Sequence, residues 1–224
     1  MVDRISRILE RALPTGVGKA AGALLDELSV YSVSVINGAK AARQYKGSTN
    51  LKIQLGCGPR VKPGWVNIDL AKTADVRMDM RRRLPFSDNS CAVIYSEHFL
   101  EHIDYPGPIT TLLQDCLRIL QPGGLFTFAV PDIDMVLRAY VNGGSPEYWE
   151  AQRRWGPAWC STHVEFINYN FRQDGEHRFA YDAETMTKLL SNVGFVNIRK
   201  REFDPALDSK DRIVGSLYMD ARKT

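Results

Sequence analysis

Residues 51–70 read LKIQLGCGPRVKPGWVNIDL, and this stretch decides the fold class of the 224-residue chain. One apolar run of strand length ends in Gly56 and Gly58, and a second apolar run ends at Asp69. In parallel α/β sheets, ligands bind beyond the carboxyl ends of the strands, where glycines form tight turns. The stretch therefore predicts two neighbouring parallel strands with a binding site at their carboxyl ends.

Strands and helices alternate over the rest of the chain. Further runs of strand length lie at 74–80, 91–96, 125–130, 195–201 and 213–219. Apolar residues at helical spacing fill 109–120 and 186–193. This order predicts an α/β fold with a seven-stranded, mostly parallel sheet that carries helices on both faces.

The N-terminal part of the chain has a different pattern. A short helix that Pro14 ends and a longer one from about Gly18 to Arg43 are expected here. We expect residues 1–45 to form a helical arm and residues 46–224 to form the main domain. The arm is expected to pack on the domain or to join subunits of a homo-oligomer. Because every cofactor motif begins at residue 51, deletion of residues 1–43 is expected to leave cofactor affinity largely intact, while activity or assembly should fall.

Composition excludes several classes of protein. A net charge of +3, with 44% hydrophobic and 25% charged residues, is typical of a globular protein and too mild to favour a nucleic-acid partner. No apolar run is long enough for membrane insertion. Cys57, Cys91, Cys116 and Cys160 form no C-x-x-C pair and are expected to be reduced thiols. A cytoplasmic location is the expectation.

The distance between the glycines and the first acid distinguishes two kinds of ligand. A dinucleotide site needs a full helix after the glycines and an acid about 20 residues on. Only ten residues separate Gly58 from Asp69, and Pro59 and Pro63 among them disfavour a helix. A ligand with a ribose but no pyrophosphate therefore fits better than a nicotinamide dinucleotide.

Three segments in order resemble class I S-adenosylmethionine-dependent methyltransferases: 51–70, then DMRRRLPFSDNSCAVIYSEHFLEHI at 79–103, then LRILQPGGLFTFAVPD at 117–132. The resemblance is closest to small bacterial members of the type-11 methyltransferase-like group. It implies an enzyme with a Rossmann-like fold, an antiparallel last strand and S-adenosylmethionine as the cofactor. It also implies the following cofactor-binding residues: Leu55, Gly56, Cys57, Gly58, Asp69, Leu70, Asp79, Met80, Ser96 and Glu97.

The motif HFLEH, from His98 to His102, follows the fourth expected strand and allows three roles. Glu101 and His102 can cap a helix, or a histidine can serve as general base. In the third role the motif resembles the metal site of ubiquinone-pathway and small-RNA 2′-O-methyltransferases, which carry E-x-x-E-H here. The RNA enzymes add a histidine about sixty residues later, matching His163. On a helix, His98, Glu101 and His102 would share one face. The catalytic candidates are thus His98, Glu101, His102 and His163. The metal candidates are Glu101, His102 and His163, with Mg²⁺ or a similar divalent cation.

The region 132–181 is the least regular in pattern and is expected to bind the acceptor. Its aromatic and carboxylate residues would suit a sugar, so Asp132, Asp134, Trp159 and His177 are the substrate candidates. The expected function is O-methylation of a hydroxyl, foremost that of a saccharide. The alternatives are the hydroxyl of a small aromatic compound, an RNA 2′-hydroxyl, or a non-catalytic scaffold that binds the cofactor.

Overall fold

The structure is a computed structural model that describes residues 13–144 and 146–224, so the first expected helix lies outside the described residues. Seven strands form one sheet in the order β3-β2-β1-β4-β5-β7-β6. Only β7 runs antiparallel to its neighbours. The seven-stranded sheet and its antiparallel last strand are therefore confirmed. The strands are β1 Leu51–Leu55, β2 Val66–Asp69, β3 Val76–Arg77, β4 Cys91–Glu97, β5 Leu120–Pro131, β6 Val196–Lys200 and β7 Ser216–Arg222.

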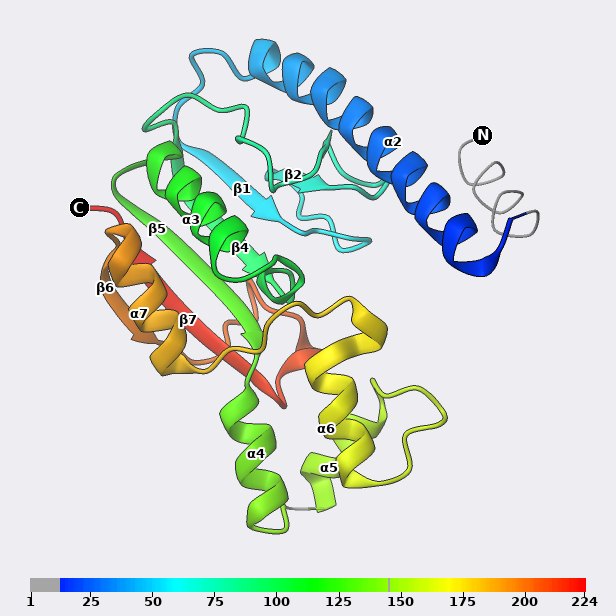
Figure 1. The fold of residues 1–224 in the computed structure, drawn as a ribbon. Helices are drawn as coiled ribbons and strands as arrows, with labels where there is room; N and C mark the ends of the chain where they lie inside the picture. Colours follow the sequence, from blue (N-terminus) through cyan, green and yellow to red (C-terminus); the bar gives the residue numbers. More distant parts are fainter. Residues whose placement is uncertain (1–12, 145) are drawn as a thin grey trace.

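The helices of the described chain fall into three groups (Figure 1). The long α2 lies beside β3, α3 and α7 pack on the sheet, and three shorter helices lie beyond the carboxyl end of β5. Short 3-10 turns complete the set. The bounds are α2 Thr15–Gln44, α3 Gly107–Ile119, α4 Ile133–Val141, α5 Pro146–Arg153, α6 His163–Arg172, α7 Ala183–Val193, η1 Leu100–His102, η2 Gln173–Gly175 and η3 Lys210–Arg212.

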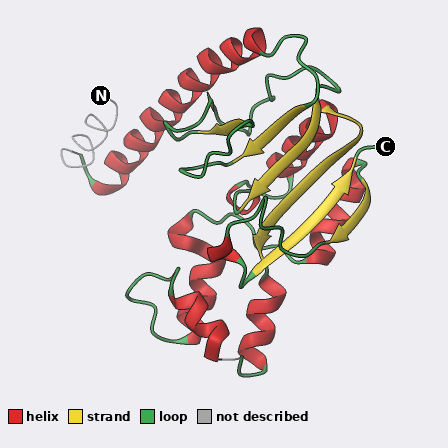
Figure 2. Cartoon of the chain, turned by 180° about the vertical axis from the view of Figure 1, so that it is seen from behind, coloured by secondary structure: helices red, strands yellow, loops and turns green. Residues whose placement is uncertain are grey.

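The helices of the predicted α/β fold are unevenly distributed over the two faces of the sheet. In the described chain α3 and α7 cover one face, while loops cover the face turned to the viewer in Figure 2. The cause is that the connections after β1, β2 and β3 contain no helix. Side chains alternate accordingly, with Ile53, Ile94 and Phe126 in the apolar core. Their polar or aromatic neighbours face the loops: Gln54, Asn67, Tyr95, Thr127 and Tyr218.

The loop between β6 and β7, residues 201–215, is fixed to this polar face by buried charged groups. The Arg201 guanidinium donates through Nη2 to Asp208 Oδ1 at 2.8 Å and through Nε to Thr127 Oγ1 at 2.9 Å. The Tyr95 hydroxyl donates to the same aspartate at 3.1 Å. Buried charges of this kind are tolerated only when they are paired and hydrogen-bonded. The loop is therefore a fixed part of the structure, and it leads to the site described below.

The region 132–181, expected to be the least regular, instead contains α4, α5 and α6. Its own small core consists of Val136, Tyr148, Trp149, Cys160 and Phe166. These helices hang below the sheet in Figure 1. Only short capping motifs in the sequence mark the starts of two of these helices. The carboxylate of Asp132 caps α4, and Thr162 and Glu165 form a capping box at the start of α6.

The arm packs on the main domain through polar contacts of α2. The Asn37 amide donates to Arg77 O at 3.1 Å, and the Ser34 hydroxyl accepts from Asp79 N at 2.9 Å.

No helix of the described residues is long and apolar enough to cross a membrane. The solvent side of α2 carries apolar residues at coiled-coil spacing, which the predicted homo-oligomer would use. They are Leu24, Leu28, Tyr31 and Val35.

Candidate active site

A cleft of about 640 Å³ lies at the carboxyl ends of the first strands and faces the arm. Its position is the one that the rule for parallel sheets predicts. Half of the residues expected to bind the cofactor line it. These are Gly56, Asp69, Leu70, Asp79 and Met80.

Gly56 ends β1 in a conformation that favours glycine. Its φ angle is +67°, and an added Cβ atom would lie 2.4 Å from Cβ of Phe99. Both the backbone angle and the contact exclude a side chain at this position. The glycine thus lets Phe99 close against the backbone and form part of the cleft wall.

Asp69 ends β2 with its carboxylate held in place by backbone amides. Oδ2 accepts a hydrogen bond from Gly58 N and Oδ1 accepts one from Ala71 N, both at 2.8 Å. Each carboxylate oxygen has a second lone pair. The fixed carboxylate can therefore accept hydrogen bonds from the two hydroxyls of a ribose in the cleft.

The other residues expected to bind the cofactor do not line this cleft. Ser96 is fully buried, and its hydroxyl has no hydrogen-bond partner among the described residues. The Glu97 carboxylate accepts from N and Oγ of Ser209, at 2.8 and 2.6 Å, in the loop on the polar face. The residues outside the cleft lining are Leu55, Cys57, Gly58, Ser96 and Glu97.

The arm also contributes to the cleft, which the sequence did not indicate. Glu27 of α2 lines it, and Oε2 of this residue lies 3.1 Å from Arg81 Nη2. Arg81 donates in turn through Nε to Asp79 Oδ2 at 2.8 Å. Deletion of residues 1–43 would remove this part of the cleft wall, contrary to the expectation that cofactor affinity stays largely intact.

We predict that Ser34→Ala weakens the binding of S-adenosylhomocysteine about tenfold. The substitution leaves the Asp79 amide without its acceptor, a loss of about 1–3 kcal/mol that loosens the loop bearing Asp79 and Arg81. Calorimetric titration measures the affinity for S-adenosylhomocysteine. Ser32→Ala is the matched control, because its hydroxyl bonds only to Leu28 O on the exposed side of the same helix. Equal affinities for both variants would separate the arm from cofactor binding.

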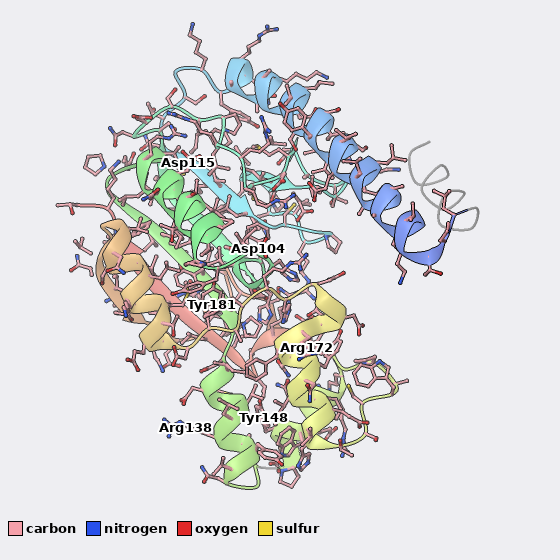
Figure 3. The ribbon with its side chains drawn as sticks, in the orientation of Figure 1. Asp104, Asp115, Arg138, Tyr148, Arg172 and Tyr181 are labelled. Atoms are coloured by element: carbon pink, nitrogen blue, oxygen red, sulfur yellow. The ribbon has the colours of Figure 1, made fainter. Side chains whose placement is uncertain are left out.

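A second cavity, of about 280 Å³, adjoins the cleft and shares His98 and His102 with it. Its walls come from η1, from α5 and α6, and from the loop before β7. Figure 3 labels Asp104, shortly after η1, and Arg172, at the end of α6. The other lining residues include Gln152, Trp155, Phe166, Tyr169, Asn170, Gln173, His177 and Arg212.

The HFLEH segment is not the α-helix that the spacing suggested. His98 has a φ angle of +51°, and only Leu100–His102 form a 3-10 turn. Nε2 of His98 lies 2.7 Å from the Ser216 hydroxyl. That hydroxyl donates to the Arg212 carbonyl, so His98 is the donor in this pair. This bond directs Nε2 of His98 toward β7, while its Nδ1 lies 3.8 Å from Glu101 Oε1.

Glu101, His102 and His177 bring one ligand atom each within 4.8 Å of one another. They are the one such group of three in the described part of the chain. His177 reaches the group because Arg178 N donates to Glu101 O at 2.7 Å. The predicted third ligand, His163, is wrong. Its ring stacks on Trp149 in the small helical core, with centroids 3.9 Å apart.

Burial sets the charge states of the three groups in this cluster. Burial raises the pKa of Glu101 to about 8, and neither of its carboxylate oxygens has a hydrogen-bond partner in the described structure. Burial lowers the pKa of both His102 and His177, so their imidazoles are neutral at pH 7. His177 Nδ1 donates to Asn170 O at 2.6 Å, so its Nε2 is available as a ligand, the arrangement common around protein-bound metals.

Of the four predicted substrate residues, only His177 lines the second cavity. Asp132 accepts hydrogen bonds from the first amides of α4, including Asp134 N at 3.1 Å. The Asp134 carboxylate pairs with Arg138 on the surface. Trp159 is 53% exposed. The aromatic wall is made instead by Trp155, Phe166 and Tyr169.

Comparison with known proteins agrees with this geometry. Residues 18–200 match a family model described as a methyltransferase domain, a match that begins inside the arm. No curated protein matches the chain.

Solved structures with a similar fold are distant in sequence. An S-adenosylmethionine-dependent methyltransferase from Mesorhizobium loti is 16% identical, with 84% of this chain and 98% of that chain covered and a TM-score of 0.48. One from Archaeoglobus fulgidus is 15% identical, with coverages of 84% and 93% and a TM-score of 0.48. Phosphoethanolamine N-methyltransferase 2 from Haemonchus contortus, in complex with S-adenosylmethionine, is 14% identical, with coverages of 84% and 52% and a TM-score of 0.47. The chain spans 52% of the CurJ carbon methyltransferase chain.

The sheet order, the antiparallel β7 and the cleft beyond β1 and β2 define a class I S-adenosylmethionine-dependent methyltransferase. Since the family match covers most of the chain, the protein belongs to this methyltransferase-domain family.

Proposed function

We propose that the protein transfers the methyl group of S-adenosylmethionine to a hydroxyl oxygen of a saccharide. The observation that carries the proposal is the cluster of Glu101, His102 and His177 at the junction of the two cavities. An acceptor in the smaller cavity would place its hydroxyl beside this cluster and the donor cleft. Bound S-adenosylmethionine supplies an activated methyl group on a positively charged sulfur.

The cluster offers two ways to activate a hydroxyl. The neutral imidazole of His102 or His177 can accept its proton near pH 7. Alternatively, the two imidazoles and the Glu101 carboxylate can hold a divalent cation, which would supply positive charge next to the oxygen. The orphaned carboxylate favours the second way. Mixed nitrogen and oxygen ligands suit Mn²⁺, Fe²⁺ or Zn²⁺ better than Mg²⁺, which prefers oxygen.

The wall of the acceptor cavity supports a saccharide. Trp155, Phe166 and Tyr169 provide apolar surfaces on which a sugar ring can stack. The amides of Gln152, Asn170 and Gln173 provide donors and acceptors for several hydroxyls. A phenolic acceptor would use the same aromatic wall, so it stays the second candidate.

Transfer of a labelled methyl group tests the proposal. The purified protein would be offered neutral and acidic saccharides, catechols and a short RNA, and calorimetry would follow S-adenosylhomocysteine binding in parallel. Label in an alkali-stable methyl ether of a sugar is the expected result. Label in catechol or RNA alone would overturn the saccharide assignment. Cofactor binding without transfer to any hydroxyl would favour the scaffold alternative.

A further inference from the structure

The acceptor cavity contains one guanidinium group, that of Arg212 in η3. Its side chain is 24% exposed, and its guanidinium carbon lies 5.9 Å from the centre of the Trp155 ring. The Arg212 carbonyl accepts hydrogen bonds from Ser216 Oγ at 2.6 Å and Tyr218 Oη at 3.2 Å. These bonds from β7 fix the backbone from which the side chain enters the cavity.

The hydrogen-bonding capacity of this guanidinium is largely unused. Within the described structure its one hydrogen bond joins Nη1 to the neutral Glu97 carbonyl at 3.1 Å. The nearest carboxylate, that of Glu97, lies 3.8 Å away, beyond hydrogen-bond distance. Both oxygens of this carboxylate already accept from Ser209. A guanidinium has five N–H donors, so most of those of Arg212 have no partner among the described residues.

The surroundings of Arg212 also disfavour its charge. Burial and the nearby positive charge of Arg60 lower the pKa of Arg212. Asp211 faces away and pairs with Arg60 at 2.8 Å. An anion inside the cavity would therefore find a fixed, partly desolvated cation with free donors.

We propose that the acceptor carries an anionic group, a carboxylate or a phosphate, and that Arg212 binds it. A planar guanidinium binds either group through two parallel hydrogen bonds. The choice of a sugar as the acceptor rests on the proposed function. Together, the two proposals define the substrate class as an acidic saccharide, such as a uronate or a sugar phosphate. Arg212 then fixes the orientation of the acceptor while the sugar ring stacks on the aromatic wall.

Paired probes separate the charge from the rest of the acceptor. The protein with S-adenosylhomocysteine bound is titrated by calorimetry with methyl β-D-glucuronide, glucose 6-phosphate and the neutral methyl β-D-glucoside. Dihydroxybenzoate and catechol form a second pair, which tests the charge if the acceptor is aromatic. We expect the acidic member to bind at least tenfold more tightly, and the two sugar anions to reveal which group is preferred.

Three variants assign that preference to Arg212. Arg212→Met should abolish it while leaving the neutral probe's affinity unchanged, and Arg212→Lys should keep part of it. Lys210→Met, an exposed position in the same short turn, should behave as the parent protein. Equal affinities within each pair, no binding of any acidic probe, or an undiminished preference in Arg212→Met would overturn the proposal. Weaker S-adenosylhomocysteine binding in Arg212→Met would overturn it too, because Arg212 would then serve the cofactor. If only the aromatic pair showed tighter binding of its acidic member, the role of Arg212 would be retained and the saccharide assignment rejected.

Discussion

Methyl transfer by this protein is expected to stop when divalent cations are removed, while S-adenosylhomocysteine stays bound. Treatment with a chelator should lower turnover roughly 100-fold or more, and added Mn²⁺ should restore it. The reason is the geometry of Glu101, His102 and His177, which is separate from the Asp69 end of the cleft. Without a cation, burial favours the protonated form of Glu101.

Variants of the three ligands give this prediction a direct readout. Glu101→Gln, His102→Ala and His177→Ala should each weaken Mn²⁺ binding, measured by electron paramagnetic resonance without any acceptor present. His163→Ala is the control, since its ring stacks on Trp149 outside the cluster. Full turnover by the metal-free enzyme would contradict the prediction. His102 and His177 would then be the candidate bases, and the pH profile of the corresponding variant should change.

Asp69→Ala should weaken S-adenosylhomocysteine binding by roughly 2–3 kcal/mol, which is about 30- to 150-fold. The loss has two parts, because the carboxylate is expected to accept from the ribose and also holds the amides of Gly58 and Ala71. Asp69→Asn keeps an oxygen acceptor but loses the charge, so its affinity should lie between those of Asp69→Ala and the parent.

Calorimetry measures the affinities, and thermal unfolding checks that the variants are folded. A folded Asp69→Ala protein with the parent's affinity would remove Asp69 from the donor site. If Asp69→Asn and Asp69→Ala were equally weak, the charge itself would account for the loss.

The sheet and the donor cleft could be predicted because their signals are local. Each strand is a short apolar run, and Gly56 and Asp69 stand at the ends of two of them. The rule that ligands bind at the carboxyl ends of parallel strands then brings these residues together without further information. The side chains of Ser96 and Glu97 could not be placed in this way, since neighbouring residues of a strand point to opposite faces.

The second cavity could not be predicted, because it depends on contacts between distant segments. The spacing of histidines suggested His163, whereas the backbone bond between Arg178 and Glu101 places His177 at the cluster. Arg212 belongs to no sequence motif. It reaches the cavity only because hydrogen bonds fix the loop that contains it to the sheet. Spacing along the chain contains no information about such tertiary contacts.

Two different parts of the chain line the two cavities. The residues that line only the donor cleft come mostly from before residue 105, and those that line only the acceptor cavity come mostly from after residue 130. The segment 201–215 contributes Arg212, Val214 and Gly215 to the smaller cavity and no residue to the lining of the donor cleft. Substitutions at these three positions would change the smaller cavity while the strands that end at Gly56 and Asp69 keep their sequence. This separation would allow the acceptor to change while the methyl donor stays the same.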